Sequence, residues 1–358
     1  MILRIGIFAA LSLLAVAPAR AAAAPAQPPV SAQAAEEALK EGLSLQVDGD
    51  VKEAIRQFDR AIQGNPKNGK AYLARGNAYA ELGEDERAIK DYSEALRLDP
   101  KDGEAYRGRG DAYRRLGQRD RALKDYDAAI VLIPEDADIY LNRGTVYYTM
   151  EKYEFALRDY TQAILRNSEY ADAYYNRGNT YMGMGNKERA IEDYNKALSL
   201  NGELVEAYYN RGTAYANLGQ NDKAVEDYTK VIGAYPKAPE PYYNRGLAYF
   251  KQDEAEKAIE DYNEAIRLDP KDPEAIFNRG MAFAKIEKYD NAARDFTEVI
   301  TILPKSGEAY GQRGLVRLRQ GRDKEGAADI ARAYQLDPNL KKKLQPLVDE
   351  TKKAGEKK

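Results

Sequence analysis

The side chains available for chemistry are restricted, because the 358-residue sequence contains no Cys, no His and no Trp. Without Cys and His the chain has no thiol nucleophile, no imidazole base, no disulfide and no structural zinc site of the usual kind. The sequence also lacks a phosphate-cradling glycine loop and a nucleophile elbow. We therefore expect a protein that is not an enzyme and that uses no metal or other cofactor.

Asparagine and aromatic residues form the most regular polar pattern in the chain. One asparagine recurs every 34 residues, at Asn142, Asn176, Asn210, Asn244 and Asn278 (the Asn row). An aromatic residue precedes each of the last four, giving Tyr175, Tyr209, Tyr243 and Phe277 (the aromatic row). An amide offers both a donor and an acceptor, which suits the main chain of a bound peptide. Aromatic side chains beyond those a core needs are typical interface anchors.

The same helical face extends to other residues. It contains Asn179, and towards the C-terminus it becomes apolar and basic, where Leu247 and Met281 stand beside Lys251 and Lys285. We predict that both rows, together with Asn179, Leu247 and Met281, bind an extended segment of a partner protein. In the alternative interpretation the asparagines cap helices or are solvated, and the extra tyrosines pack between neighbouring repeats.

A 34-residue period organises the chain from residue 35 to residue 340. The dipeptide Arg-Gly marks it, beginning at Arg75, Arg109, Arg143, Arg177, Arg211, Arg245, Arg279 and Arg313. Within each repeat, apolar residues occur twice at helical spacing on either side of a turn such as Gly185-Asn186. We predict two antiparallel helices in each of nine repeats: 35–68, 69–102, 103–136, 137–170, 171–204, 205–238, 239–272, 273–306 and 307–340.

These columns resemble the tetratricopeptide repeat (TPR) of secreted bacterial proteins. In repeat 171–204 its signature positions are Tyr174, Gly178, Tyr181, Ala190, Tyr194 and Ala197. The resemblance covers about six-sevenths of the chain. It implies an all-α fold, a right-handed α-solenoid of antiparallel helix pairs with about nine repeats and a C-terminal capping helix. It also implies a concave groove, in which several family members hold a peptide main chain with asparagines of this column.

Two charged columns accompany the repeats. Each arginine of the Arg-Gly dipeptide is followed 16 residues later by an aspartate, as Arg177 is by Asp193. Both columns are missing from the first repeat, which has Glu41 and Gln57 instead. This joint absence favours Arg–Asp pairing within a repeat. The functional alternative is a row of arginines that binds an anionic ligand.

The N-terminal residues have the pattern of a secretory signal. Arg4 precedes an apolar stretch at 5–16 that is shorter than the ~20 residues of a membrane-spanning helix, and Ala-x-Ala cleavage patterns follow. We predict a signal peptide at 1–21, with cleavage after Ala19, Ala21 or Ala24, and a flexible lead-in at 22–34. We expect a periplasmic or secreted protein of a Gram-negative bacterium, with no integral membrane span after cleavage.

The C-terminal residues 341–358 are predicted to form a capping helix with a lysine-rich tail, in which Pro346 kinks or shortens the helix. We favour a solvated cap, because lysine-rich termini are common. The alternative is a weak contact of this tail with an anionic surface.

The function that these observations predict is a non-catalytic protein–protein interaction module. Its partners would be other proteins or peptides. The chain has 55 basic and 58 acidic residues, and this balance argues against binding to nucleic acid. The alternative function is a structural spacer or scaffold in an envelope complex, such as one for polysaccharide export or outer-membrane assembly.

Overall fold

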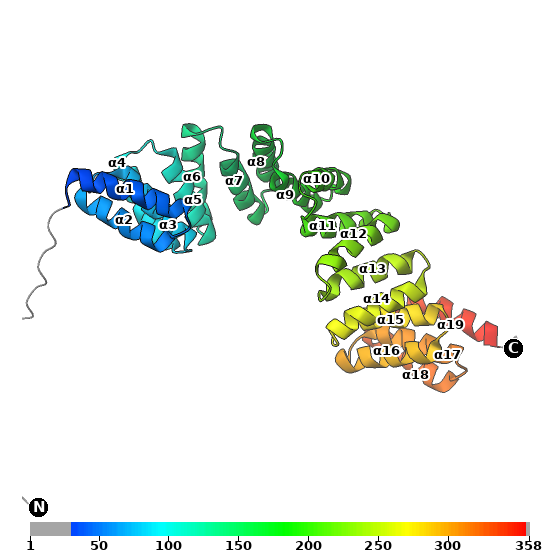
Figure 1. The fold of residues 1–358 in the computed structure, drawn as a ribbon. Coiled ribbons are helices and arrows are strands. Elements are labelled where there is room, and N and C mark those ends of the chain that lie inside the picture. The colour runs from blue at the N-terminus through cyan, green and yellow to red at the C-terminus, as the bar shows by residue number, and fades with distance from the viewer. Residues whose placement is uncertain (1–29, 356–358) are drawn as a thin grey trace, which may run out of the picture. The chain divides into compact units, whose positions relative to one another are not determined.

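The computed structural model describes residues 30–355, and these residues form nineteen α-helices and no strand (Figure 1). The predicted signal peptide lies outside the described residues, as does most of the predicted lead-in. None of the helices in the described part of the chain is both long and apolar enough to cross a membrane.

Each 34-residue repeat contains one pair of helices. The first helices are α1 (Ala32–Val47), α3 (Gly69–Glu81), α5 (Gly103–Arg115), α7 (Ala137–Thr149), α9 (Ala171–Gly183), α11 (Val205–Asn217), α13 (Pro239–Lys251), α15 (Pro273–Lys285) and α17 (Gly307–Arg319). The second helices are α2 (Val51–Gly64), α4 (Asp85–Leu98), α6 (Arg119–Leu132), α8 (Tyr153–Arg166), α10 (Lys187–Leu200), α12 (Asn221–Ala234), α14 (Ala255–Leu268), α16 (Tyr289–Ile302) and α18 (Asp323–Leu336). A final helix, α19 (Leu340–Gly355), follows the last pair.

The helices belong to two compact bodies. The N-terminal body ends at Pro100 and contains α1–α4, and the C-terminal body begins at Lys101 and contains α5–α19. Within each body a helix packs on its pair partner, and the second helix of one repeat packs on the first helix of the next, as α10 does on α11. The predicted fold class, an all-α solenoid of stacked helix pairs, is therefore confirmed.

Local sequence signals set the ends of these helices. The side chain of Asp272 accepts hydrogen bonds from the backbone N–H groups of Glu274 (2.8 Å) and Ala275 (3.3 Å), which caps the start of α15. Between α9 and α10 the chain reverses through Gly185, which has a φ of 80° that residues with a side chain rarely adopt. Such turns hold the two helices of a repeat antiparallel.

The core of a repeat depends on close contact between a glycine and an aromatic ring. A Cβ atom on Gly178 would lie only 2.8 Å from Cε1 of Tyr194, so α9 and α10 can approach only because this position is glycine. Tyr194, Ala190 and Ala197 are all fully buried, and Tyr194 packs with Ala190. The predicted role of the Gly, Ala and second-helix Tyr columns in core packing is confirmed.

The predicted Arg–Asp pairs are present and bidentate. In repeat 171–204 the Nε and Nη2 atoms of Arg177 donate to the two carboxylate oxygens of Asp193, each at 2.8 Å. The same geometry joins Arg75 to Asp91, Arg109 to Asp125, Arg143 to Asp159, Arg211 to Asp227, Arg245 to Asp261, Arg279 to Asp295 and Arg313 to Asp329. The hydrogen bonds with Asp193 raise the pKa of Arg177 above its ordinary value. The alternative, an arginine row that is available to an anionic ligand, is wrong because these guanidinium groups already have partners.

The third nitrogen of the arginine extends the contact to the preceding repeat. Nη1 of Arg211 donates to Oδ1 of Asn195 at 2.6 Å, and Nη1 of Arg143 donates to Oδ1 of Asp127 at the same distance. Each of these arginines therefore joins both helices of its own repeat to the second helix of the repeat before it.

The last helix departs from the stacking rule. Helix α19 packs mainly on α17, a first helix, and makes little contact with α18. Sequence analysis predicted that Pro346 would kink or shorten this helix, but α19 continues beyond Pro346 to Gly355. The prediction of shortening is therefore wrong. Leu340, Leu344 and Val348 are buried and pack on the last repeat. This packing offsets the cost of a proline inside the helix, so the helix continues past it.

We expect Arg177→Ala to lower the free energy of unfolding by about 3–5 kcal/mol, because it leaves the buried Asp193 carboxylate unpaired. The matched control is Arg267→Ala, which breaks the pair between Arg267 and Glu264, two side chains that are 63% and 45% exposed. That change should cost no more than about 1 kcal/mol. Urea unfolding followed by circular dichroism measures both, and equal losses would contradict a special role for the buried pair.

Candidate partner-binding surface

Three first helices enclose a hollow of about 340 Å³ in the C-terminal body, which we call the central hollow. Its walls are Tyr175 of α9, Val205, Glu206, Tyr209 and Asn210 of α11, Glu240 and Pro241 of α13, and Val231, Tyr235 and Ala238 at or after the end of α12. The structure thus brings together three of the predicted binding residues, Tyr175, Tyr209 and Asn210, which come from two successive repeats.

The asparagines of the Asn row link neighbouring repeats. The amide nitrogen of Asn210 donates to the hydroxyl of Tyr175 (3.2 Å) and to Oδ1 of Asn179 (2.9 Å). In the same way Asn244 donates to the hydroxyl of Tyr209 at 3.0 Å, and Asn278 to the hydroxyl of Tyr243 at 3.1 Å. Their amide oxygens accept no hydrogen bond from the described residues, so each amide keeps one acceptor for a ligand.

The first two members of the row differ from this pattern. Asn142 donates to Oδ1 of Asp111 at 2.9 Å, a carboxylate that also accepts from the hydroxyl of Tyr126. Asn176 makes no side-chain hydrogen bond within the described residues, because Leu141 occupies the place of the tyrosine in the preceding repeat. Asn176 therefore has both its donor and its acceptor free.

The aromatic row lies half-buried on the core. Its rings pack on the buried aromatic residue of the same repeat, with centroids 6.1 Å apart for Tyr175 and Tyr194 and 5.4 Å apart for Phe277 and Phe296. Tyr209 and Tyr243 make the equivalent contacts with Tyr228 and Tyr262. These ring contacts lie within one repeat, whereas the alternative interpretation placed the tyrosines between neighbouring repeats. The rings of Tyr175 and Tyr209 also line the central hollow.

The column of Asn179 meets the buried tyrosine hydroxyls. Oδ1 of Asn179 accepts a hydrogen bond from Tyr194 at 2.7 Å. Leu247 occupies this column two repeats later and packs with Tyr262, whose buried hydroxyl consequently has no partner. Met281 follows one repeat further on and packs in the cluster of Phe296, a ring that has no hydroxyl. Asn179 and Leu247 line neither of the hollows on this face, whereas Met281 lines a second one described below.

Two features of the central hollow were missed by the sequence analysis. Tyr235 is 49% exposed and forms one wall. It is the only aromatic residue in a column that otherwise holds residues such as Asn201 and Asp269, and this contrast was the available signal. The carboxylates of Glu206 and Glu240 also line the hollow. The hollow is therefore lined mainly by apolar groups, and its two exposed carboxylates give it an acidic rim.

Acidic groups also affect the aromatic row itself. Burial, together with the nearby Glu274, raises the pKa of Tyr243 to about 12. Its hydroxyl donates a hydrogen bond to Glu274 at 3.4 Å and accepts the one from Asn278.

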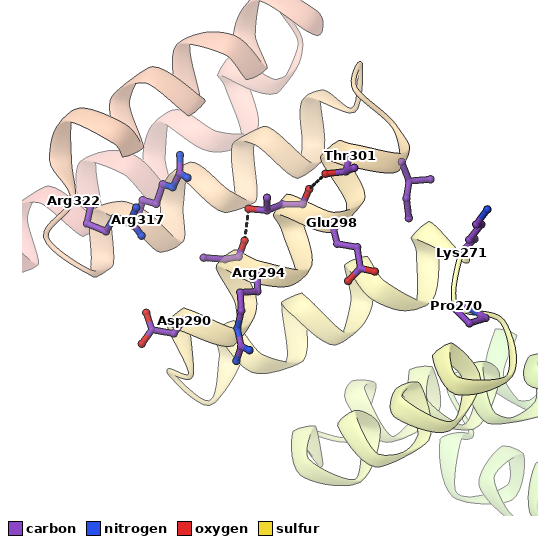
Figure 2. A pocket seen from close by; sticks show the side chains of 11 residues that line it. Pro270, Lys271, Asp290, Arg294, Glu298, Thr301, Arg317 and Arg322 are labelled. Carbon is purple, nitrogen blue, oxygen red and sulfur yellow. Dashed lines mark hydrogen bonds between the residues drawn. The ribbon is translucent and has the colours of Figure 1, made fainter.

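A larger hollow, about 860 Å³, lies on the second-helix side and is called the outer hollow. Figure 2 shows Asp290, Arg294, Glu298 and Thr301 along α16, with Arg317 and Arg322 at one end and Pro270 and Lys271 at the other. Its polar groups are largely satisfied locally: Arg317 and Arg322 pair with acidic residues of α18, and the Thr301 hydroxyl donates to the backbone of its own helix. None of the predicted binding residues lies there.

The described residues contain no group of three or more acidic side chains placed to hold a metal ion. The polar chemistry of the central hollow is that of amides, phenols and two carboxylates, which suits hydrogen bonding to a polypeptide.

The chain belongs to the tetratricopeptide repeat family. Models described as tetratricopeptide repeat match residues 137–170, 171–204, 209–273 and 277–340, and a model described as TPR repeat matches 76–117 and 110–151. Together these matches cover well over half of the chain. No curated protein matches it.

Solved structures with the same fold include two TPR proteins. One, from Parabacteroides merdae ATCC 43184, is 22% identical over 71% of this chain and 98% of its own, with a TM-score of 0.50. The C-terminal part of a TPR repeat-containing protein from Cytophaga hutchinsonii is 21% identical over 66% of this chain and 98% of its own, with a TM-score of 0.56. MamA is 30% identical over 45% of this chain and 95% of its own, with a TM-score of 0.43.

We expect Asn210→Ala to lower the free energy of unfolding by about 1–2 kcal/mol, because it removes hydrogen bonds to Tyr175 and Asn179. Asn176→Ala is the matched control, since Asn176 occupies the same position and lacks such partners. Its effect should stay within about 0.5 kcal/mol. Thermal and urea unfolding measure both variants. Equal effects would show that the inter-repeat amide bonds do not stabilise the array.

Proposed function

We propose that this chain is a non-catalytic protein–protein interaction module, and that the first-helix face of repeats 171–306 binds an extended segment of a partner protein. Membership of the TPR family supports the general role in protein interaction. The observation that carries the specific proposal is the central hollow, because an apolar cavity there is bordered by aromatic rings and by an amide with a free acceptor.

The geometry suggests how a segment would be held. An apolar side chain of the partner would enter the central hollow between Tyr175, Tyr209 and Tyr235. The amide oxygen of Asn210, at the wall of the hollow, would accept a hydrogen bond from the main chain of the same segment. Basic side chains on either side of the apolar residue would lie near Glu206 and Glu240.

The spacer interpretation makes a different demand on this surface. A passive spacer needs only a solvated and chemically uniform face, whereas here the rings of Tyr175, Tyr209 and Tyr235 line an apolar cavity. Such a cavity has no use in a spacer, and we therefore favour the binding role.

We propose to test the binding role with Tyr235→Ala, which removes one wall of the central hollow. The Tyr235 side chain is 49% exposed, so its loss should have little effect on folding. The variant should keep the wild-type circular dichroism spectrum. It should capture much less of the partner protein that the wild-type chain captures from envelope extract, as quantified by mass spectrometry. Loss of an interface aromatic residue typically costs about 2 kcal/mol or more, which is a decrease in affinity of about 30-fold.

Leu303→Ala is the matched control for that experiment. Leu303 occupies the same column two repeats later and is 46% exposed, but it does not line the central hollow. It should capture the wild-type set of proteins. If Tyr235→Ala captures that set as well as the control does, the central hollow is not the binding site and the spacer interpretation becomes the better one.

We also propose that the module acts outside the cytoplasm, in the periplasm. The support is the pattern of a positive residue, an apolar stretch and small residues at 1–21. N-terminal sequencing of the protein from a periplasmic fraction should begin just after Ala19, Ala21 or Ala24. Recovery of the chain in the cytoplasm with Met1 or Ile2 at its start would contradict export.

A further inference from the structure

The ninth repeat lacks the aromatic residue that the four repeats before it carry on the first-helix face. Gly311 occupies the column of Tyr175, Tyr209, Tyr243 and Phe277. A Cβ atom on Gly311 would lie 2.5 Å from Cδ1 of Leu344, so a side chain of α19 occupies the space that the aromatic ring would fill. In the same way Leu340 packs against Gly307 at the start of α17. Helix α19 therefore covers the first-helix face of the last repeat.

Beside this helix lies a second hollow of about 290 Å³, which we call the C-terminal hollow. It is lined by Phe250 of α13, Met281, Ala284 and Lys285 of α15, Gln312, Leu315, Val316 and Arg319 of α17, and Leu347 of α19. Leu347 is 39% exposed although it belongs to a helix whose other large apolar residues are buried. The hollow is thus an apolar cavity to which α19 contributes one wall.

The charge of the C-terminal hollow is opposite to that of the central hollow. Its only charged lining residues are Lys285 and Arg319, and no carboxylate lines it. The ammonium of Lys285 packs 4.9 Å from the ring centroid of Phe250 and also pairs with the exposed Asp253. Arg319 has no carboxylate partner within the described residues, so its guanidinium is available to a ligand.

These cations occupy successive repeats only at the end of the array, although Arg115 stands in the same column in repeat 103–136. Lys251, Lys285 and Arg319 share one column, and the two repeats before them have Gly183 and Asn217 there. Repetition of the TPR pattern therefore does not require the cations. Two of them, Lys285 and Arg319, line the apolar C-terminal hollow.

We infer that the C-terminal hollow binds an apolar side chain of the partner segment that is flanked by aspartate or glutamate side chains. This inference rests on the proposed function, since it names a second contact of the same bound segment. The apolar side chain contacts Met281, Leu315 and Leu347, and the flanking carboxylates meet Lys285 and Arg319. The acidic rim of the central hollow selects the opposite charge, so the two hollows together fix the direction of the segment.

The test uses a defined probe and the full chain. The probe is a fluorescein-labelled, C-terminally amidated peptide in which one leucine stands between pairs of aspartates, and binding is followed by fluorescence anisotropy at low ionic strength. We expect Arg319→Gln to weaken binding several-fold. The double variant Lys285→Gln, Arg319→Gln should weaken it about tenfold, as expected from the loss of two charge contacts of about 0.7 kcal/mol each. Added salt should weaken wild-type binding.

Controls separate the hollow from non-specific charge effects. Arg294→Gln removes a cation from the outer hollow (Figure 2) and should bind the probe as the wild type does. Leu347→Asp should abolish binding, because it places a negative charge inside the cavity, and circular dichroism should show that α19 keeps its helix. A probe with lysines in place of the aspartates should not bind.

Several results would overturn the inference. They are an absence of probe binding to the wild type, equal binding of the lysine probe, binding only when the probe has a free C-terminal carboxylate, or unchanged binding by the double variant. Failure here is distinguishable from failure of the proposed function. If Tyr235→Ala loses the captured partner while the double variant retains it, the binding role stands and only the C-terminal hollow is excluded as a contact.

Discussion

The bidentate pair between the arginine of one helix and the aspartate of the next is the contact on which the rest of the array depends. It fixes the first helix on the second within a repeat, and the third arginine nitrogen connects that pair to the preceding repeat. Because the carboxylate is buried, the arginine cannot leave without a large electrostatic penalty. The first helices are therefore held in register, and residues 34 positions apart form continuous rows on one face.

Because of that register, single substitutions within the repeated sequence change the hydrogen bonds and cavities of the first-helix face. Where Tyr175 is present, Asn210 donates to it, and where Leu141 replaces the tyrosine, Asn176 is free. The same amides thus stabilise the stack and leave acceptors for a ligand. Glycine at position 311 has a larger effect, because it admits α19 onto the face, and Leu347 of α19 forms one wall of a second cavity with the opposite charge.

The period, the helix pairs and the Arg–Asp contacts could be predicted from sequence, because each depends on residues that recur from the second repeat to the ninth. The cavities could not, since they depend on single departures from the pattern. Tyr235 is the one aromatic residue in its column, and Leu347 follows the last repeat. The hydrogen-bond partners of the Asn row could not be predicted either. Helical spacing gives the face on which a residue lies, but not its distance from side chains of the next repeat. The unpaired hydroxyl of Tyr262 is another consequence of a single departure, because Leu247 replaces the asparagine that accepts this hydrogen bond in repeat 171–204.

The central claim is that a partner lies on the first-helix face of the C-terminal body. Carbene footprinting of the chain alone and with its captured partner tests it most directly, because labelling reports the exposure of individual side chains. The account predicts that the partner reduces labelling of Tyr235 and Tyr209, and leaves unchanged the labelling of Val131 and Phe155, which are 81% and 50% exposed on second helices. Protection of Val131 and Phe155 with no change at Tyr209 and Tyr235 would contradict it.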